Sequence, residues 1–448
     1  PIDVSSVESS TVMTREQIDS IAVPRNVTAV ALLAPGTVKG DNRFGCVRAC
    51  PDGLASIGGA SVAENAYFIN GFNVTNIVTG LAFSQVPFEG IAEQQVKTGG
   101  YGAEYGRSLG GVVNVITQSG TNDWDFGANV VFQPKSLNDS DRFTYDPDRD
   151  GVFETKTSEQ LERTVFNVDV GGPIIKDKLF MYALVQASQT EKFGENEGGS
   201  DYYKSNTPQG LLKLDWHIND KNLLELTAFR DENETDGKVF NRTPGDLTFG
   251  GGDLVGTSNE KRGGDNYIGR WTGFLTDTFT LSALYGEGKY SRSTTDSNSE
   301  TCPRIVDTRT SAAVGPLGVQ GCWVTTTKGV PDAGDTRKAY RVDAEWSIGD
   351  HTVKFGLDNE EFETVDGSEY SGGIYYRFDN TTAGTTLSGN GGIVPAGVTE
   401  VVRGRYFKNG GTFLTKNSAW YVEDTWNVTD NFLVYAGFRS ESFENLNS

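Results

Sequence analysis

Apolar and polar residues alternate strictly along several long segments of the chain, and this pattern limits the possible folds more than any other feature. From Tyr340 to Ile348 every second residue is apolar, and the residues between them are charged or polar. A period of two sustained over such a length predicts a β-strand with one apolar and one polar face. The pattern starts again after Gly349-Asp350-His351, which predicts a hairpin.

Short and long connections alternate between these segments. Tight turns are predicted at 173–177, 219–221, 276–277, 349–351 and 429–431, and long connections at about 135–160, 192–206, 234–263, 293–336 and 367–415. A membrane β-barrel has brief turns at one end and extended loops at the other. A soluble sandwich with its apolar faces inward is the alternative. Segments such as 279–292 exceed the usual strand length of globular sheets and are long enough to cross a bilayer at a tilt, which favours the barrel.

About eleven barrel strands are expected. Their predicted starts lie near Trp124, Arg163, Lys178, Pro208, Asn222, Tyr267, Thr278, Arg337, His351, Ser418 and Asn431. Lipid does not tolerate the open edge of such a sheet, so we expect further strands after Ser448. Plugged outer-membrane transporters have about 22 strands, so this chain would supply about half of a barrel. Aromatic residues near the strand ends suit an interfacial girdle: Trp216, Trp271, Trp346, Trp426 and Tyr435.

Residues 1–120 lack long hairpins and are rich in small residues and short apolar runs. They predict a compact α+β plug domain that fits inside a wide lumen, followed by the transmembrane antiparallel β-barrel from residue 121 to residue 448. Within the plug, the segment from Gln17 to Ala34 predicts a short helix that ends at Pro35-Gly36. The run from Tyr67 to Gly71 predicts a strand that leads into a turn.

Composition agrees with a membrane barrel. Only 36% of the residues are hydrophobic, yet 11% are aromatic and 55 are glycine. Lumen-facing residues keep the overall hydropathy of a barrel low, whereas disordered chains lack aromatic residues. No stretch of eighteen uncharged apolar residues occurs, so no membrane-spanning helix is expected. No signal-peptide pattern begins at Pro1, so we expect the sequence to start within a mature protein. The net charge of -21 argues against nucleic acid as a partner.

The four cysteines form two local pairs, Cys46 with Cys50 and Cys302 with Cys322, each in loop-like sequence. Two disulfides in an oxidising compartment are the favoured interpretation. Zinc is the alternative. The two histidines, His217 and His351, lie far in sequence from either pair and offer a two-cysteine site no partners.

A tract of more than thirty residues carries a family resemblance. The run VPFEGIAEQQVKTGG (86–100) continues as YGAEYGRSLGGVVNVITQSGTN (101–122), and it resembles the plug segment that TonB-dependent outer-membrane receptors place before their last plug strands. Further phrases resemble the Oar-like (OmpA-related) branch of that family: Ser119-Gly120-Thr121-Asn122, Arg25-Asn26, Ala34-Pro35-Gly36 and Gly171–Phe180. The TonB box and the small β-sandwich of Oar-like members are not recognisable in this sequence.

The resemblance implies an active importer in the outer membrane of a Gram-negative bacterium, surrounded by lipid and lipopolysaccharide. Substrate would bind outside, between plug apices and barrel loops, and TonB in the periplasm would pull on the plug. The resemblance also suggests that Glu104 and Arg107 hold the plug to the barrel wall. Lumen-facing acids are the expected partners of Arg107: Asp169, Asp215, Asp343 and Glu345. A charge pair in a wet lumen breaks at modest cost, as a reversible latch requires. A static contact is the alternative.

One acidic segment has the spacing of half a calcium loop. Carboxylates at positions 1, 3 and 5 precede a glycine and a carbonyl at position 7, with a further acid beyond: Asp146, Asp148, Asp150, Val152 and Glu154. Thr157 occupies position 12, where the bidentate Glu belongs, and Glu154 is its candidate substitute. A structural calcium ion in the first outer loop is one interpretation, and an ordinary acidic loop is the other.

Two predicted plug loops carry candidate substrate contacts. Arg43, Phe44 and Arg48 lie on the first, and Phe72, Asn73 and Phe83 on the second. Packing within the plug is the alternative role for these side chains. Pairs of glycines at 99–100 and 110–111 are interpreted as turn and close-approach devices and not as a phosphate cradle, since no helix follows them.

Energised import of a bulky solute is the leading functional hypothesis. An adhesin or structural outer-membrane protein, or a channel for protein export, are the alternatives. An enzyme is disfavoured, because no spacing of nucleophile and base is present and the two histidines lie at predicted strand ends. Siderophore, glycan, peptide and protein substrates are all compatible with the sequence.

Overall fold

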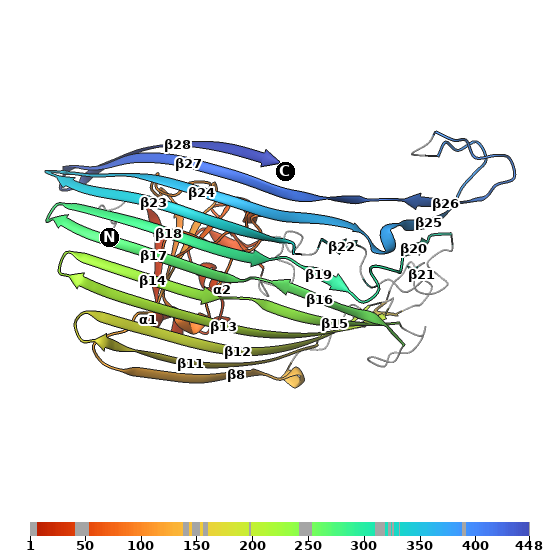
Figure 1. Ribbon diagram of the computed structural model, residues 1–448, viewed down its shortest axis with the longest axis horizontal. Coiled ribbons are helices and arrows are strands. Elements are labelled where there is room, and N and C mark those ends of the chain that lie inside the picture. The colour runs from red at the N-terminus through yellow and green to blue at the C-terminus, as the bar shows by residue number, and fades with distance from the viewer. Residues whose placement is uncertain are drawn as a thin grey trace.

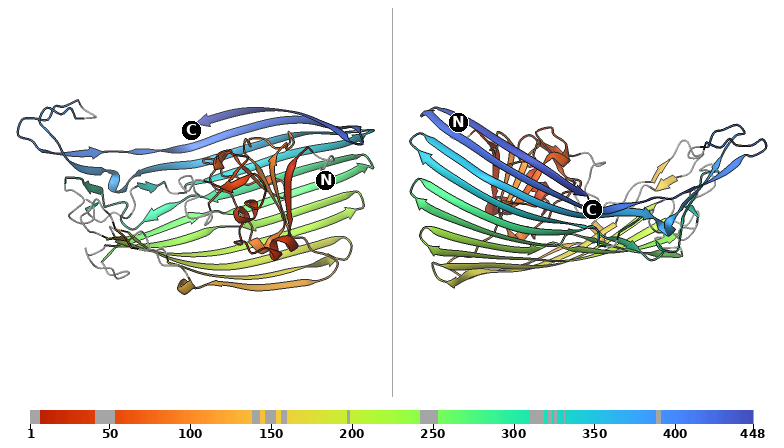
Figure 2. Two further views of the ribbon diagram at one scale, coloured as in Figure 1. Left: turned by 180° about the vertical axis from the view of Figure 1, so that it is seen from behind. Right: turned by 45° about the horizontal axis from the view of Figure 1, so that its top comes forward.

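The computed structural model describes residues 7–40, 53–137, 143–145, 153–155, 160–196, 199–241, 253–309, 319–320, 324, 327–330, 332–387 and 391–447. A small N-terminal unit lies on the inner face of one long, curved sheet (Figures 1 and 2). Its last strand ends at Thr117, and the first strand of the large sheet begins at Asp125. The predicted boundary between plug and barrel, at residue 120, falls in this connection.

The plug is built on a five-stranded sheet in the order β1-β6-β7-β4-β5. Only β4 and β7 run parallel to each other. The strands are β1 (Ser9–Thr14), β4 (Ala66–Ile69), β5 (Phe72–Asn73), β6 (Ile91–Gly99) and β7 (Val112–Thr117), with a separate pair β2 (Thr37–Lys39) and β3 (Ala55–Ile57). Short 3-10 turns occupy η2 (Val62–Glu64) and η3 (Phe88–Gly90). The predicted strand and turn at 67–71 are confirmed, because β4 ends at Ile69 and Asn70 and Gly71 have φ values of 49° and 84°.

The single helix predicted from Gln17 to Ala34 is wrong, because this stretch forms two short helices. Helix α1 (Arg15–Ser20) ends before an extended Ile21, and α2 (Val27–Ala31) begins after Asn26. Pro24 has a fixed φ and lacks an N–H, so it interrupts a helix. The Asn26 side chain accepts a hydrogen bond from the Ala29 N–H at 2.7 Å and so caps α2. Within the described residues, no helix has the length and apolarity needed to cross a membrane.

The large sheet has fifteen strands in the described part of the chain, and eleven of them form one continuous antiparallel series from β8 to β28, which is the number of barrel strands predicted. These eleven are β8 (Asp125–Gln133), β11 (Gln160–Ile175), β12 (Leu179–Asn196), β13 (Gly199–Asn219), β14 (Asn222–Arg230), β17 (Asp265–Thr276), β18 (Phe279–Ser291), β23 (Gly334–Ile348), β24 (His351–Tyr370), β27 (Lys408–Thr429) and β28 (Phe432–Asn447). The sheet ends at β8 and β28 without closing, as Figure 2 shows.

The five tight turns stand where the alternation predicts them. Each connects neighbouring strands by two or three residues, as between Ile348 of β23 and His351 of β24. All five lie at one end of the sheet, here called the turn end, and the long connections lie at the other, the loop end (Figure 1). The five predicted tight turns are therefore confirmed, whereas the alternation with long connections has an exception, because only residues 197 and 198 connect β12 to β13.

Several predicted long connections are partly strand. Hairpin β12–β13 continues to Asn196 and Gly199, where a loop was expected at 192–206. Strands β15 (Asn233–Asn241) and β16 (Leu254–Arg262) extend β14 and β17 in the same way. In these extensions both faces are polar, so the sequence lacks the apolar alternation that reveals the lower strands, although the backbone still makes ladder hydrogen bonds.

Smaller elements complete the loop end. A four-stranded sheet has the order β21-β20-β25-β26, with β20 (Arg304–Asp307), β21 (Val319–Gln320), β25 (Tyr375–Asn380) and β26 (Glu400–Arg405). The remaining short elements are β9 (Phe143–Tyr145), β10 (Phe153–Thr155), β19 (Thr294–Asp296), β22 (Thr327–Gly329), η4 (Lys135–Leu137) and η6 (Ser371–Gly373).

The outer face of the large sheet is apolar and exposed. On β23, the side chains of Tyr340, Val342, Trp346 and Ile348 are 43 to 47% exposed. Trp216 and Trp426, near the turn end of neighbouring strands, are also exposed. An apolar surface of this extent with aromatic residues near its border is typical of contact with lipid. Polar side chains at the alternate positions face the plug.

Candidate functional site

The loop that connects β6 to β7 contacts the inner face of the wall. Arg107 of this loop forms an ion pair with Glu360 of β24, whose side chain is only 3% exposed. Arg107 has a φ of 57°, a left-handed conformation that is uncommon for a residue with a side chain. Burial lowers the pKa of Arg107 from its usual value, and Asp358 and Glu441 offset part of this effect. The guanidinium nevertheless stays charged at neutral pH, because arginine titrates far above it.

Glu104 of the same loop contacts a second group of wall residues. Its Oε2 lies 2.7 Å from Nη2 of Arg341 in β23, and its Oε1 lies 4.0 Å from Nζ of Lys354 in β24. Arg341 also pairs with Asp343 at 2.8 Å, and Tyr421 donates its hydroxyl to Asp343 at 2.6 Å. The structure therefore places both predicted latch residues, Glu104 and Arg107, in ion pairs with the barrel wall.

The backbone of this loop is also bound to the wall. The Ala103 N–H donates to the hydroxyl of Tyr435 at 3.0 Å, and Arg439 donates to the Glu104 carbonyl at 3.3 Å. At Gly102, an added Cβ would lie 2.7 Å from Oε2 of Glu423, so a larger residue here would displace the Glu423 carboxylate. Strands β23, β24, β27 and β28 thus all contact residues 102–107, here called the latch loop.

The sequence did not predict the partner of Arg107. Of the four acids expected, Asp343 belongs to the Glu104 group through Arg341, Asp215 lies 3.6 Å from Lys213, Glu345 lies 3.7 Å from Lys354, and Asp169 lies on β11. Glu360 continues the lumen-facing series of Lys354 and Asp358 on β24, and this period-two series was the signal that could have identified it. The height at which the latch loop meets each strand depends on strand tilt and register, which the sequence does not show.

A second contact joins the plug to the wall nearer the loop end. Asn70 donates to Thr227 of β14 at 2.9 Å, and Asn76 donates to Asp335 of β23 at 3.1 Å. The Gln85 N–H donates at 2.9 Å to Asp231, a buried carboxylate between β14 and β15. The other oxygen of Asp231 accepts the Gly264 N–H at 2.9 Å. Residues 70–85, here called the asparagine loop, are therefore held mainly by uncharged donors.

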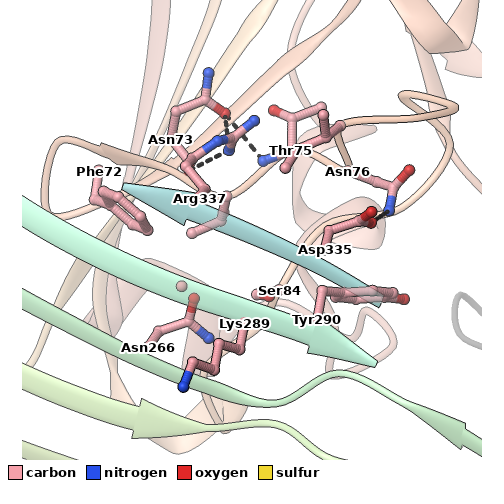
Figure 3. A pocket seen from close by; sticks show the side chains of 13 residues that line it. Phe72, Asn73, Thr75, Asn76, Ser84, Asn266, Lys289, Tyr290, Asp335 and Arg337 are labelled. Carbon is pink, nitrogen blue, oxygen red and sulfur yellow. Dashed lines mark hydrogen bonds between the residues drawn. The ribbon is translucent and has the colours of Figure 1, made fainter. Parts of the chain in front are cut away.

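A small cavity of about 30 Å³, partly open to solvent, lies between the asparagine loop and strands β17, β18 and β23 (Figure 3). Its walls include Phe72, Asn73 and Asn76 of the plug and Asn266, Asp335 and Arg337 of the barrel. Nη1 of Arg337 donates to the Asn73 backbone carbonyl and, at 3.0 Å, to its side-chain oxygen. Asp335 is held by Arg292 at 2.9 Å.

Arg337 lies between this cavity and the latch. Its guanidinium carbon and that of Arg107 are each 5.1 Å from the centre of the Phe362 ring. The Nε atom of Arg337 is 4.0 Å from Oε1 of Glu360, the partner of Arg107. The two plug contacts are therefore linked through one shared group of wall residues.

Two of the predicted substrate contacts, Phe72 and Asn73, line the cavity and are 1% and 8% exposed. Phe83 stacks on Tyr67 within the plug, with ring centres 3.9 Å apart. The other three, Arg43, Phe44 and Arg48, lie outside the described residues. Sequence reasoning missed Asn266 and Arg337, although both belong to lumen-facing series of their strands.

The predicted metal and disulfide positions fall mostly outside the described residues. Asp146, Asp148, Asp150 and Val152 lie outside them, and Glu154 belongs to the short strand β10. Cys46, Cys50 and Cys322 also lie outside, whereas Cys302 is described and is 3% exposed. The calcium ion and the two disulfides stay predictions.

Known proteins share both the sequence pattern and the architecture of this chain. The profile of the family described as outer membrane beta barrel domain matches residues 185–447. The TonB-dependent transporter Oar of Myxococcus xanthus is 30% identical over 191 residues, which cover 41% of this chain and 17% of that protein.

Solved structures show the same fold over nearly the whole chain. The outer membrane transporter YddB of Escherichia coli superposes with a TM-score of 0.62 at 13% identity, covering 98% of this chain and 57% of that chain. The siderophore receptor PirA of Acinetobacter baumannii gives a TM-score of 0.54 at 17% identity, with coverages of 98% and 57%. The ferripyoverdine receptor of Pseudomonas aeruginosa gives 0.56 at 14% identity, with coverages of 98% and 52%.

The chain spans little more than half the length of these structures and a smaller part of Oar. The proteins it resembles are outer-membrane transporters and receptors, which places it in the Gram-negative outer membrane. The chain therefore belongs to the family described as outer membrane beta barrel domain, and it is similar to the TonB-dependent transporter Oar and shares the fold of solved outer-membrane transporters and receptors.

Proposed function

We propose that the complete receptor imports a bulky solute with energy supplied through TonB, and that the latch loop is the contact released during transport. One observation carries this proposal: the plug is attached to the wall by ion pairs and hydrogen bonds at Glu104, Arg107 and the asparagine loop. The side chains of these ion pairs are mostly buried, so each pair holds more firmly than the about 0–1 kcal/mol of an exposed pair, and a pull transmitted by TonB would have to break them one after another.

The similarity to Oar and to solved transporters and siderophore receptors supports this proposal. The loop end would face outside and the turn end the periplasm, as short periplasmic turns and long outer loops are the rule for such barrels. The cavity beside Phe72 and Asn73 lies toward the loop end, and we propose that the solute enters the plug–wall contact there.

Uptake in cells with and without TonB tests the proposal. The complete receptor is expressed in both backgrounds, and accumulation of candidate solutes, beginning with ferric siderophores, is measured. Import that requires TonB is expected in the wild type. The same accumulation in both backgrounds would reject energised transport and favour a passive or structural role.

A second candidate function is adhesion through the loop end. The sheet β21-β20-β25-β26 lies beyond the main wall (Figure 1), and it presents exposed Val402 and, just after β26, Tyr406. If this surface binds another cell or matrix component, deletion of residues 375–405 would abolish adhesion and leave TonB-dependent uptake intact.

A further inference from the structure

The cavity between the asparagine loop and the wall contains two buried N–H donors that have no hydrogen-bond acceptor among the described residues. They are Nε of Arg337 and Nδ2 of Asn266. Arg337 is 6% exposed and Asn266 is 2% exposed, and both line the cavity. Buried donors are normally paired, so two orphaned donors at one partly open cavity indicate a site for an acceptor.

Two of the other polar groups at the cavity, Asp335 and Asn73, are already engaged. Asp335 accepts hydrogen bonds from Nε and Nη2 of Arg292 at 3.0 and 2.9 Å and from Asn76 at 3.1 Å. Nη1 of Arg337 is bound to Asn73, which in turn accepts the Thr75 N–H at 3.0 Å. Figure 3 shows Asn73 and Asn76 on the plug side of this cavity and Asn266 on the barrel side. The buried polar atoms at the cavity that lack a hydrogen-bond partner are therefore donors, and one of them belongs to a cationic side chain.

Glycine keeps the space open. A Cβ added to Gly288 would lie 2.5 Å from Oδ1 of Asn266 and 3.3 Å from Cε1 of Phe72. A larger residue at this position would occupy the space beside Asn266 and the Phe72 ring. The Phe72 ring, 1% exposed, gives the cavity an apolar side opposite its polar groups.

We propose that this cavity binds a carboxylate group of the transported solute, with Nε of Arg337 and Nδ2 of Asn266 as the donors. A carboxylate accepts from both, and a charge-assisted bond to a guanidinium is stronger than a neutral one. This assignment rests on the proposed import function for its ligand. The binding chemistry itself depends only on the cavity.

An occupied cavity would also affect the latch. Arg337 lies 4.0 Å from Glu360 and shares the Phe362 ring with Arg107. A carboxylate at Nε would compete with Glu360 for the charge of Arg337 and leave Arg107 as its principal cationic partner. Binding at the loop end is therefore coupled to the ion pair that holds the latch loop.

Formate is the smallest probe of the carboxylate class, and its single proton allows saturation-transfer NMR on the purified complete receptor in detergent. The wild type is expected to give a formate signal that acetate displaces. Gly288→Ala, which fills the cavity, and Asn266→Asp, which replaces the donor by an acceptor of the same shape, should each weaken binding by about tenfold or more. Gly269→Ala on the outer face of β17, where the nearest atom to a new Cβ is 3.4 Å away, is the matched control and should bind as the wild type does.

Equal formate signals in the wild type and Gly288→Ala would show an adventitious additive only and overturn the proposal. No signal in a wild type that melts cooperatively would do the same, because water then fills the cavity. A formamide signal as strong as that of formate would overturn the assignment to a carboxylate. Formate binding in a receptor whose uptake ignores TonB would leave the cavity assignment standing and overturn only the import function.

Discussion

Arg107 of the plug is paired with Glu360 of the barrel wall even though its backbone occupies the left-handed region, with a φ of 57°. Such a conformation costs about 1 kcal/mol or more for a residue with a side chain, and the surrounding contacts must compensate for it. The pair therefore depends on the whole latch loop and its neighbours on β23, β24, β27 and β28.

Replacement of Arg107 by alanine should destabilise the plug–wall contact. Glu360 would stay buried with only Arg337, 4.0 Å away, as a cationic neighbour. We expect a loss of about 1–3 kcal/mol, below the value for a fully orphaned charge. Thermal unfolding of the complete receptor measures it. Glu361→Gln, an exposed acid next in sequence that lies 3.7 Å from Lys416, is the control and should change stability by less than about 0.5 kcal/mol. If the double variant Arg107→Ala with Glu360→Gln is as unstable as Arg107→Ala, the pair is not the cause.

Gly102→Ala should weaken the latch loop without removing any polar group. The new Cβ would lie 2.7 Å from one carboxylate oxygen of Glu423 and 3.1 Å from the other, so the loop or Glu423 must move. Overpacking of this kind costs about 1–3 kcal/mol. Gly99→Ala, where nothing lies within 4 Å, is the control at the start of the same connection. Equal urea midpoints for the two variants would show that the close approach of Gly102 to Glu423 does not contribute to stability.

Salt should loosen Glu104 from Arg341 more readily than it affects the asparagine loop. The Debye length falls from about 10 Å at 0.1 M to about 3 Å at 1 M salt, and this screening weakens an ion pair between partly exposed charges more than it weakens hydrogen bonds in which at most one partner is charged. A spin label at Ser108 should therefore gain mobility with salt, and one at Val78 should not. Identical salt responses at the two positions would contradict the division into charged and neutral contacts.

The loop-end sheet should respond to acid through Asp307. Hydrogen bonds from the Arg309 side chain and backbone lower the pKa of Asp307 to about 2. A depressed carboxyl pKa adds stability above the ordinary value near 4, and this stability is lost as pH falls through about 2. The protection factors of the β20 and β25 amides should thus fall below about pH 4, with Asp307→Asn showing low protection at every pH. A flat profile in the wild type would remove Asp307 from this role.

Calcium binding to the segment 146–154 is testable by calorimetry on the complete receptor after chelator treatment. Asp148→Asn should weaken binding by about tenfold, because a calcium site depends on the number of its charged oxygen ligands. Asp139→Asn, in the same connection but outside the spacing, should bind as the wild type does. Heat of binding that is unchanged in Asp148→Asn, or absent from the wild type, would leave the segment as an ordinary acidic loop.

The sequence predicted the wall well because each side of a membrane strand meets a different solvent. Lipid and lumen impose the period-two pattern seen from Tyr340 to Ile348, and the tight turns interrupt it at recognisable residues. The extensions β15 and β16 escaped prediction because both of their faces meet water. The break between α1 and α2 was not predicted, although Pro24 lies within this stretch and interrupts a helix.

The candidate site was only partly predictable. Glu104 and Arg107 were identified through a family resemblance, and the structure gives them partners on strands more than two hundred residues away in sequence. Which lumen-facing acid meets Arg107 depends on how far each strand is displaced along its neighbour. The cavity donors Arg337 and Asn266 come from different strands, β23 and β17, so their proximity is a property of the folded wall alone.

The asparagine loop and the latch loop differ in what can release them. Asn70 and Gln85 are bound to strand β14 and to the short break that follows it, through bonds that respond little to ionic strength. Residues 102–107 are bound to β23, β24, β27 and β28 mainly by charged groups, whose interactions do respond to ionic strength. A plug released at the latch loop alone would rotate about the asparagine loop, and a gap would open along one side of the lumen.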